Sequence, residues 1–306
     1  MKWILRLRQL ISGFRREKSL SAPPVETPEV GGSYRYLWPY TVGVFYPEKS
    51  VFLIRNPVTD ISHRLFEFAY PAAHWLPVTG HWDGSGIMGC GLYDPLAQLF
   101  LLRNRDDSGY PDRHIRLGAM RVECLPIAGD WLGEGRDRVG VYDPVESTFF
   151  LKTDDLDGSV SCRFSLEVPP GRYLPLSGDW DGDGRDGVGL YAIETATFYL
   201  RNALSTGQAD HVFCLGTPKH DVWPLAGDWD DDGCDGVGCY DPNAGLFTLK
   251  DRFATEAAEQ TIRFGLTHFK GLPLAIRWNG WGFSHIKSDE IMADRLGLIN
   301  PATQTS

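Results

Sequence analysis

A single period of 49 residues runs through most of this 306-residue chain and limits its fold more than any other feature. Five tryptophans keep this step without a slip of one residue: Trp82, Trp131, Trp180, Trp229 and Trp278. Five prolines keep it as well: Pro77, Pro126, Pro175, Pro224 and Pro273. A strict repeat of this length indicates an array of similar units, each of which packs on its neighbours.

One unit contains four short predicted strands. It opens with residues 174–180, passes through an Asp/Gly loop at 181–187, and continues with apolar segments at 188–191, 198–201 and 211–215. Side chains alternate along a strand, so both faces of such a sheet carry apolar residues. The 34 glycines and 20 prolines also favour short strands and tight turns over helices. This pattern is typical of a propeller blade, whose faces pack against neighbouring blades.

The repeat begins and ends part-way through a unit, which predicts how the array closes. Residues 41–68 supply three strands but lack the Pro-to-Trp strand, and residues 272–278 supply that strand alone. Together they complete a fifth blade, and pairing the last strand with the first ones removes the exposed edges of an open array. We therefore predict an all-β, five-bladed propeller over residues 35–278, with an open solenoid as the alternative.

Two loops of the repeat have the carboxylate spacing of a calcium loop. Aspartates at alternate positions are followed by a glycine, as in loops that wrap oxygen ligands around a hard cation. We predict Ca²⁺ in repeats three and four, with the candidate ligands Asp179, Asp181, Asp183, Asp228, Asp230 and Asp232. The alternative is that these aspartates only accept backbone hydrogen bonds in tight turns. The loops of the other repeats have lost this spacing.

The stretch Gly-Asp-Trp-Asp-Gly-Asp-Gly-Arg-Asp-Gly at 178–187, followed by Val-Gly-Leu-Tyr, resembles the FG-GAP or VCBS type of repeat found in integrin-α-like propellers. The resemblance covers residues 41–278. It implies calcium in the acidic loop, a binding or scaffolding role, and no catalysis by the propeller. The family's further carboxylate falls on a glycine in both loops, and the nearest candidates, one residue earlier, are Asp186 and Asp235.

A basic residue ends a strand at the equivalent position of every blade. The series consists of Arg55, Arg103, Lys152, Arg201 and Lys250. In a closed ring these side chains form a belt of positive charge, which suits an anionic partner. The simpler interpretation is that a charge on an outer strand discourages edge pairing. The five tryptophans also have two interpretations, as sugar platforms or as core between blades, and their size and strand position favour the core.

No catalytic motif stands out in the sequence, and we predict that the protein is not an enzyme. The eight histidines are scattered without HExxH, and no GxSxG elbow, Walker loop or dinucleotide fingerprint occurs. The formal net charge of −10 disfavours binding to nucleic acid, which requires clustered Lys and Arg. Six dispersed cysteines without CxxC predict reduced and mostly buried thiols.

Residues 2–16 are predicted to form a basic amphipathic helix, within a segment, 1–18, whose net charge is +5. Apolar residues recur at helical spacing and arginines surround them: Trp3, Arg6, Leu7, Arg8, Leu10, Ile11, Phe14, Arg15 and Arg16. Such a helix lies on an anionic bilayer or docks in a groove of a partner, with packing on its own propeller as the alternative. The arginines break the apolar run too early for a cleaved signal peptide.

The remaining segments complete the expected domain organisation. Residues 19–34 read as an extended linker, and the tail 279–306 as a segment with a short helix from Ser288. The leading hypothesis is a non-catalytic, protein-binding propeller, held as a peripheral accessory subunit at a membrane complex, on its cytoplasmic side, by the N-terminal helix. The alternative is an extracellular or periplasmic calcium-dependent adhesin or lectin that binds glycans.

Overall fold

A computed structural model describes residues 39–278, apart from residues 59, 61–62, 69–70, 155–157, 252 and 254–258. The chain divides into two units, Met1–Ser33 and Tyr34–Ser306, and the described residues belong to the second. The predicted N-terminal helix, the linker up to residue 34 and the C-terminal tail therefore lie outside the described residues. Among the described residues, no helix is long and apolar enough to cross a membrane.

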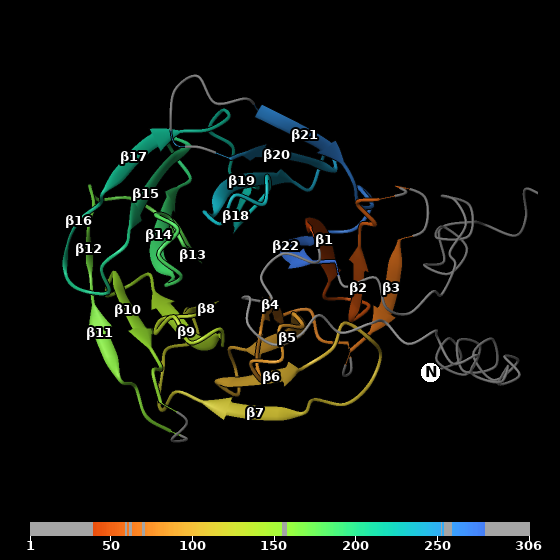
Figure 1. The fold of residues 1–306 in the computed structure, drawn as a ribbon, viewed down its shortest axis with the longest axis horizontal. Helices are drawn as coiled ribbons and strands as arrows, with labels where there is room; N and C mark the ends of the chain where they lie inside the picture. The colour runs from red at the N-terminus through yellow and green to blue at the C-terminus, as the bar shows by residue number, and fades with distance from the viewer. Residues whose placement is uncertain are drawn as a thin grey trace, which may run out of the picture. The chain divides into compact units, whose positions relative to one another are not determined.

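Five four-stranded antiparallel sheets form a five-bladed propeller, which confirms the predicted fold (Figure 1). Blade 1 contains β4 (Leu76–Gly80), β5 (Gly89–Asp94), β6 (Leu99–Arg103) and β7 (Arg113–Arg116). Blade 2 contains β8 (Leu125–Gly129), β9 (Arg138–Asp143), β10 (Thr148–Leu151) and β11 (Cys162–Phe164). Blade 3 contains β13 (Tyr173–Gly178), β14 (Gly187–Ala192), β15 (Thr197–Arg201) and β17 (His211–Cys214). Blade 4 contains β18 (Trp223–Gly227), β19 (Gly236–Asp241), β20 (Leu246–Lys250) and β21 (Glu259–Arg263).

Blade 5 is assembled from the two ends of the repeat region. Its inner strand is β22 (Leu272–Arg277), and it continues with β1 (Tyr40–Tyr46), β2 (Val51–Ile54) and β3 (Arg64–Glu67). β22 pairs antiparallel with β1 over six residue pairs, from Tyr40 opposite Arg277 to Phe45 opposite Leu272. This pairing closes the ring as the complementary sequence fragments predicted, and it covers the edge that β1 would otherwise expose.

A small parallel pair outside the blades was not anticipated from the sequence. β12 (Leu166–Glu167) pairs with β16 (Gly207–Gln208) and so joins a segment that follows blade 2 to an outer loop of blade 3. Two-residue strands carry too little hydrophobic pattern to be recognised in the sequence.

The repeated tryptophans form core between neighbouring blades. Trp82 of blade 1 packs in one cluster with Val139 and Val141 of blade 2. Trp180 of blade 3 packs with Val237 and Cys239 of blade 4 in the same manner. Four of the five are at most 8% exposed, namely Trp82, Trp131, Trp180 and Trp278, and Trp229 is half-buried. The core interpretation of this series is confirmed.

The inner strands define the two faces of the ring. Their first residues surround a small cavity of about 120 Å³ and form one end of the central channel: Leu76, Pro77, Leu125, Pro126, Leu174, Pro175, Trp223, Pro224, Leu272 and Pro273. We call this side the proline face. The acidic loops follow the last residues of the inner strands, so they lie on the opposite side, which we call the aspartate face.

Candidate functional site

The acidic loop of blade 3 brings three carboxylates together on the aspartate face. Oxygens of Asp179, Asp181 and Asp183 lie within 4.8 Å of one another; Asp179 is buried, and the other two are exposed. The Asp179 carboxylate accepts backbone hydrogen bonds from Gly182 at 2.8 Å and Gly184 at 2.8 Å, which fixes the turn. Three carboxylates at this separation can hold a metal ion, and the all-oxygen donor set suits calcium.

The corresponding loop of blade 2 forms the same turn without the full set of acidic residues, so it shows which carboxylates the turn requires. Asp130 accepts backbone hydrogen bonds from Glu134 at 2.9 Å and Gly135 at 2.6 Å, as Asp179 does in blade 3. Blade 2 nevertheless has Leu132 at the second acidic position. The second carboxylate is therefore not needed to form the turn, and the third position keeps the carboxylate of Glu134. In blade 3 the exposed carboxylates also accept hydrogen bonds, Asp181 from the Asp183 N–H at 3.3 Å and Asp183 from the Arg185 N–H at 2.8 Å. The residues of this loop fit a calcium ion because their three carboxylates cluster, with two of them exposed.

The loop of blade 4 has the same three carboxylates and one additional contact. Oxygens of Asp228, Asp230 and Asp232 lie within 4.8 Å of one another. Arg277 of blade 5 reaches into this loop, with Nη2 3.3 Å from Asp228 Oδ2 and Nη1 3.3 Å from Asp231 Oδ1. Burial raises the pKa of Asp228, and the nearby guanidinium acts in the opposite direction. The guanidinium of Arg277 thus already lies beside Asp228, one of the three clustered carboxylates.

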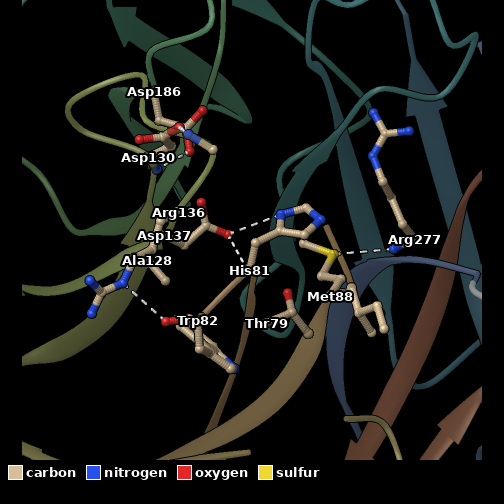
Figure 2. Close-up of polar contacts among 12 residues, drawn as sticks. Thr79, His81, Trp82, Met88, Ala128, Asp130, Arg136, Asp137, Asp186 and Arg277 are labelled. Carbon is tan, nitrogen blue, oxygen red and sulfur yellow. Dashed lines mark hydrogen bonds and ion pairs between the residues drawn. The ribbon is translucent and has the colours of Figure 1, made fainter. Parts of the chain in front are cut away.

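The structure gives Asp186 and Asp235 a different position from the calcium ligands that the resemblance implied. Asp186 Oδ2 accepts a hydrogen bond from the Asp130 backbone N–H of blade 2 at 2.8 Å, and the Asp186 N–H donates to the Asp130 carbonyl at 3.0 Å (Figure 2). Asp235 makes the same pair of bonds with Asp179, at 2.9 and 2.7 Å. Both carboxylates therefore join consecutive blades, because each caps a backbone N–H beyond the inner strand of the preceding blade.

Asp137 belongs to this capping series, which the sequence analysis missed. Its Oδ2 accepts from the His81 backbone N–H at 2.7 Å, as Figure 2 shows. The remaining described junction has a sulfur acceptor instead, because the Arg277 N–H points to Met88 Sδ at 3.2 Å (Figure 2). Burial and the neighbouring carboxylates raise the pKa of Asp186, and burial raises that of Asp235 to about 7. The hydrogen bond to Asp130 and the cost of a buried charge therefore oppose each other at Asp186.

Two substitutions separate these contributions of Asp186. Asn keeps the acceptor oxygen and removes the charge, whereas Ala leaves the buried Asp130 N–H without this acceptor, and we expect D186A to be less stable than D186N by about 1–3 kcal/mol. The pKa of Asp186 is higher in the folded than in the unfolded state, so its favourable contribution is present below about pH 4 and is lost as the pH rises. D186N should therefore gain stability relative to wild type between pH 4 and 8, which urea denaturation at each pH measures. Equal pH profiles for D186N and wild type would contradict this account.

The predicted basic belt is engaged in contacts within the protein. Arg55 pairs with Asp60 at 2.8 Å, and Lys152 pairs with Asp154 at 2.9 Å. Lys250 lies 5.9 Å from the centre of the Phe213 ring. Arg103 and Arg201 each donate to backbone carbonyls of the loop that follows their own strand. These contacts favour a structural role in every blade over a free belt of positive charge.

Arg103 offers a direct test of this structural role. Its guanidinium bonds to Asp107 Oδ1 at 2.6 Å and to the Tyr110 carbonyl at 2.8 Å, so R103M should lose about 2 kcal/mol of stability. Arg105, exposed in the same loop, provides the matched control R105M, which removes the same charge. Urea denaturation gives the stability, and retention on a heparin column gives anion binding. A stable R103M that has lost heparin retention relative to R105M would support the anionic-partner interpretation instead.

Exposed apolar residues gather on the proline face of blades 1 and 2. Leu96 in the β5–β6 turn is 66% exposed, Val145 in the β9–β10 turn is 61% exposed, and Val122 in the loop between these blades is 53% exposed. Hydrogen bonding between Gln98 and Met120 connects the first turn to this loop. We call Leu96, Val122 and Val145 the apolar patch. These positions lie in turns, outside the strand pattern, so the periodicity of the sequence does not single them out.

Ion pairs neutralise much of the charge around the proline face. Arg121 lies 3.1 Å from Asp143, and Lys219 of the loop before blade 4 lies 2.8 Å from Asp241. Arg172 and Glu194 form a third pair at 2.8 Å in blade 3. Each pair ties the segment before a blade to a turn of that blade. Several of the charges on the face that carries the apolar patch therefore already have partners.

All six cysteines are free, but only half are buried, fewer than predicted: Cys90, Cys124 and Cys239 are buried, Cys162 and Cys234 are intermediate, and Cys214 is exposed. Burial raises the pKa of the Cys239 thiol to about 12 and that of Cys124 to about 11. Thiols with raised pKa values contain little thiolate at neutral pH and are poor nucleophiles.

No protein-family model matches the sequence, and no curated protein matches it. Among solved structures, a protein of unknown function from Bacteroides caccae is 16% identical with a TM-score of 0.44, over 74% of this chain and 73% of that one. AofleA from Arthrobotrys oligospora is 9% identical with a TM-score of 0.43, over 78% and 74%. A lectin from Agrocybe aegerita that recognises terminal N-acetylglucosamine is 13% identical with a TM-score of 0.39, over 66% of this chain and 56% of the lectin. At these identities the similarity concerns the fold alone.

Proposed function

We propose that this propeller is a non-catalytic scaffold that binds another protein through the proline face and is held at an anionic membrane by residues 2–16. The observation that carries the first part is the apolar patch. Leu96, Val122 and Val145 are more than half exposed on the same face, and Arg121 beside Val122 is paired with Asp143. Adjacent exposed apolar side chains mark surfaces that other proteins cover.

The partner suited to this face presents an apolar surface. We expect full-length protein to retain a membrane-associated protein in a native-membrane pull-down, with its identity given by mass spectrometry. The double variant L96D/V145D should retain at least tenfold less of it, because burying a carboxylate in an apolar interface is costly. Val212, 58% exposed on β17, provides the control V212D. Equal retention by both variants, with wild-type melting temperatures, would exclude the proline face as the binding surface.

The membrane tether has a separate test. Full-length protein should sediment with phosphatidylcholine vesicles that contain phosphatidylserine, but not with phosphatidylcholine alone, since the net charge of +5 on residues 1–18 is attracted to anionic lipid. A chain without residues 1–18 should remain in the supernatant, and added salt should release the full-length protein. Sedimentation that is the same with and without these residues would remove the tether from the proposal. We expect the cytoplasmic side of a membrane, where anionic lipid is enriched.

A second candidate function rests on the loop of blade 3. Its three clustered carboxylates favour an extracellular or periplasmic adhesin or lectin that uses calcium, because weak sites of this kind fill where calcium is about millimolar. When bound, calcium would order the loop through Asp179, Asp181 and Asp183. A glycan array probed with and without calcium tests this function, with D183N as the variant. Calcium-dependent glycan binding that D183N abolishes would favour this function over the scaffold.

A further inference from the structure

Each acidic loop on the aspartate face is contacted by a side chain from the following blade, and the type of this side chain differs from loop to loop. Arg136 of blade 2 donates from Nε to the Trp82 carbonyl of the blade 1 loop at 3.1 Å. The next equivalent residue, Arg185, lies so close to the blade 2 loop that a Cβ at Gly133 would be 2.9 Å from Arg185 Cγ. Beside the blade 3 loop the series changes to Cys234, whose thiol lies over Gly182. Arginines thus approach the loops of blades 1 and 2, and a neutral thiol approaches the loop of blade 3.

Arg277 contacts the loop of blade 4 from a different position of the repeat than Arg136, Arg185 and Cys234. It ends the inner strand of blade 5, where the other blades carry His81, Asp130, Asp179 and Asp228. Its guanidinium contacts Asp228 and Asp231 at 3.3 Å and lies 4.4 Å from the centre of the Tyr40 ring. The Arg277 side chain is 16% exposed and the Asp228 side chain 3%. An ion pair with this burial is weakly screened by salt and holds its geometry.

We propose that Arg277 is the resident cation of the blade 4 loop and that it excludes calcium from Asp228, Asp230 and Asp232. Calcium bonds to carboxylate oxygens at about 2.3–2.6 Å, so an ion on Asp228 would lie within a few ångströms of the guanidinium and be repelled by it. The loop of blade 3 has Cys234 instead of an arginine beside it. Of the two acidic clusters among the described residues, calcium therefore binds that of blade 3, a part of the inference that rests on the calcium site of the second candidate function.

If Arg277 occupies the blade 4 loop, the contact between blades 4 and 5 does not depend on calcium. β22 is the strand that closes the ring, and through Arg277 it is joined to blade 4 by an ion pair. In the blade 4 loop, the guanidinium of Arg277 takes the place that a metal ion would have, and it stabilises the contact between blades 4 and 5. Chelators should consequently leave the junction between blades 4 and 5 unaffected.

Equilibrium dialysis of full-length protein against radioactive calcium tests the inference. In wild type, D183N should abolish calcium binding, and D232N should leave the number of bound ions unchanged. R277Q removes the cation and should add one ion, with at least tenfold higher affinity at the blade 4 loop than in wild type. The conservative variant R277K keeps a positive charge and should add none, and R277Q/D232N should lose the added ion. Near-UV circular dichroism confirms that each variant is folded.

The outcomes distinguish the two ideas. A wild type that loses an ion on D232N, or a folded R277Q that gains none, overturns the role of Arg277. If wild type binds no calcium while R277Q gains an ion that D232N removes, Arg277 keeps its role and the calcium-dependent candidate function fails. The scaffold function is independent of both results, because its tests use the proline face and residues 1–18.

Discussion

A chain that ends at residue 271 is expected to lose the folded propeller, whereas one that ends at residue 278 should retain it. The difference between these two chains is β22 and Trp278. Without β22, blade 5 has no inner strand and β1 becomes a free edge along six residue pairs. Leu274 and Ile276, both buried in the core between blades 5 and 1, are removed as well. Each large-to-small change at such a site costs about 2–5 kcal/mol, so their loss with the whole strand approaches the total stability of a domain.

Thermal unfolding followed by circular dichroism measures this effect. The chain ending at 278 should unfold in a single cooperative transition, and the chain ending at 271 should show none and should bind a dye for exposed apolar surface. Size-exclusion chromatography should show aggregation of the shorter chain, because it exposes an unpaired strand edge. Identical melting curves would mean that four blades and a partial fifth are stable alone, and that the closure contributes little.

The fold was predictable from the sequence because the tryptophans and prolines recur every 49 residues and so mark each blade. The positions of Trp82 and Trp278 alone imply that the last repeat lacks three strands, and residues 41–68 contain the three that are missing. Strand number, blade number and closure all follow from this complementarity. The burial of the tryptophans also follows, since a large aromatic residue beside an inner strand has space only between blades.

The role of Asp186 was not predictable from its own loop. Within one repeat, the residue follows the calcium-like spacing and reads as a further ligand. The residue it bonds to, Asp130, is 56 positions earlier and belongs to another blade. The sequence does contain one signal, because Asp137 occupies the equivalent position in blade 2, whose loop has lost the calcium spacing. A carboxylate that is kept where the metal spacing is absent indicates a structural role.

The contact of Arg277 was hidden for a related reason. In the repeat, Arg277 occupies the position of the first acidic residue of the fifth loop, so the sequence indicates only that this loop has lost a metal ligand. Its guanidinium acts on the fourth loop instead, because consecutive inner strands lie side by side around the channel and a long side chain reaches the neighbouring blade. Repeat alignment compares equivalent positions, and it does not show contacts between inequivalent positions of adjacent repeats.

Substitution of Trp82 by Ala should destabilise the propeller by about 3–5 kcal/mol. The indole of Trp82 is fully buried and fills the space between blades 1 and 2, next to Val139 and Val141, so its removal leaves a cavity that the surrounding strands cannot close. Trp229 is the matched comparison because it occupies the same position of the repeat and is only half-buried. W229A should therefore cost less than W82A, and W82F should cost less than W82A because the ring is partly replaced.

Urea denaturation of W82A, W82F and W229A measures this order, and it gives the contribution that the buried tryptophans make to stability. Core residues change stability in proportion to their burial, whereas sugar platforms change glycan binding and leave stability nearly unaffected. A W82A protein with wild-type stability would contradict the burial of this side chain. The expected order, with W82A the least stable, would instead assign the series to the contacts that hold consecutive blades together, and would leave the proline face and the aspartate loops as the surfaces available for ligands.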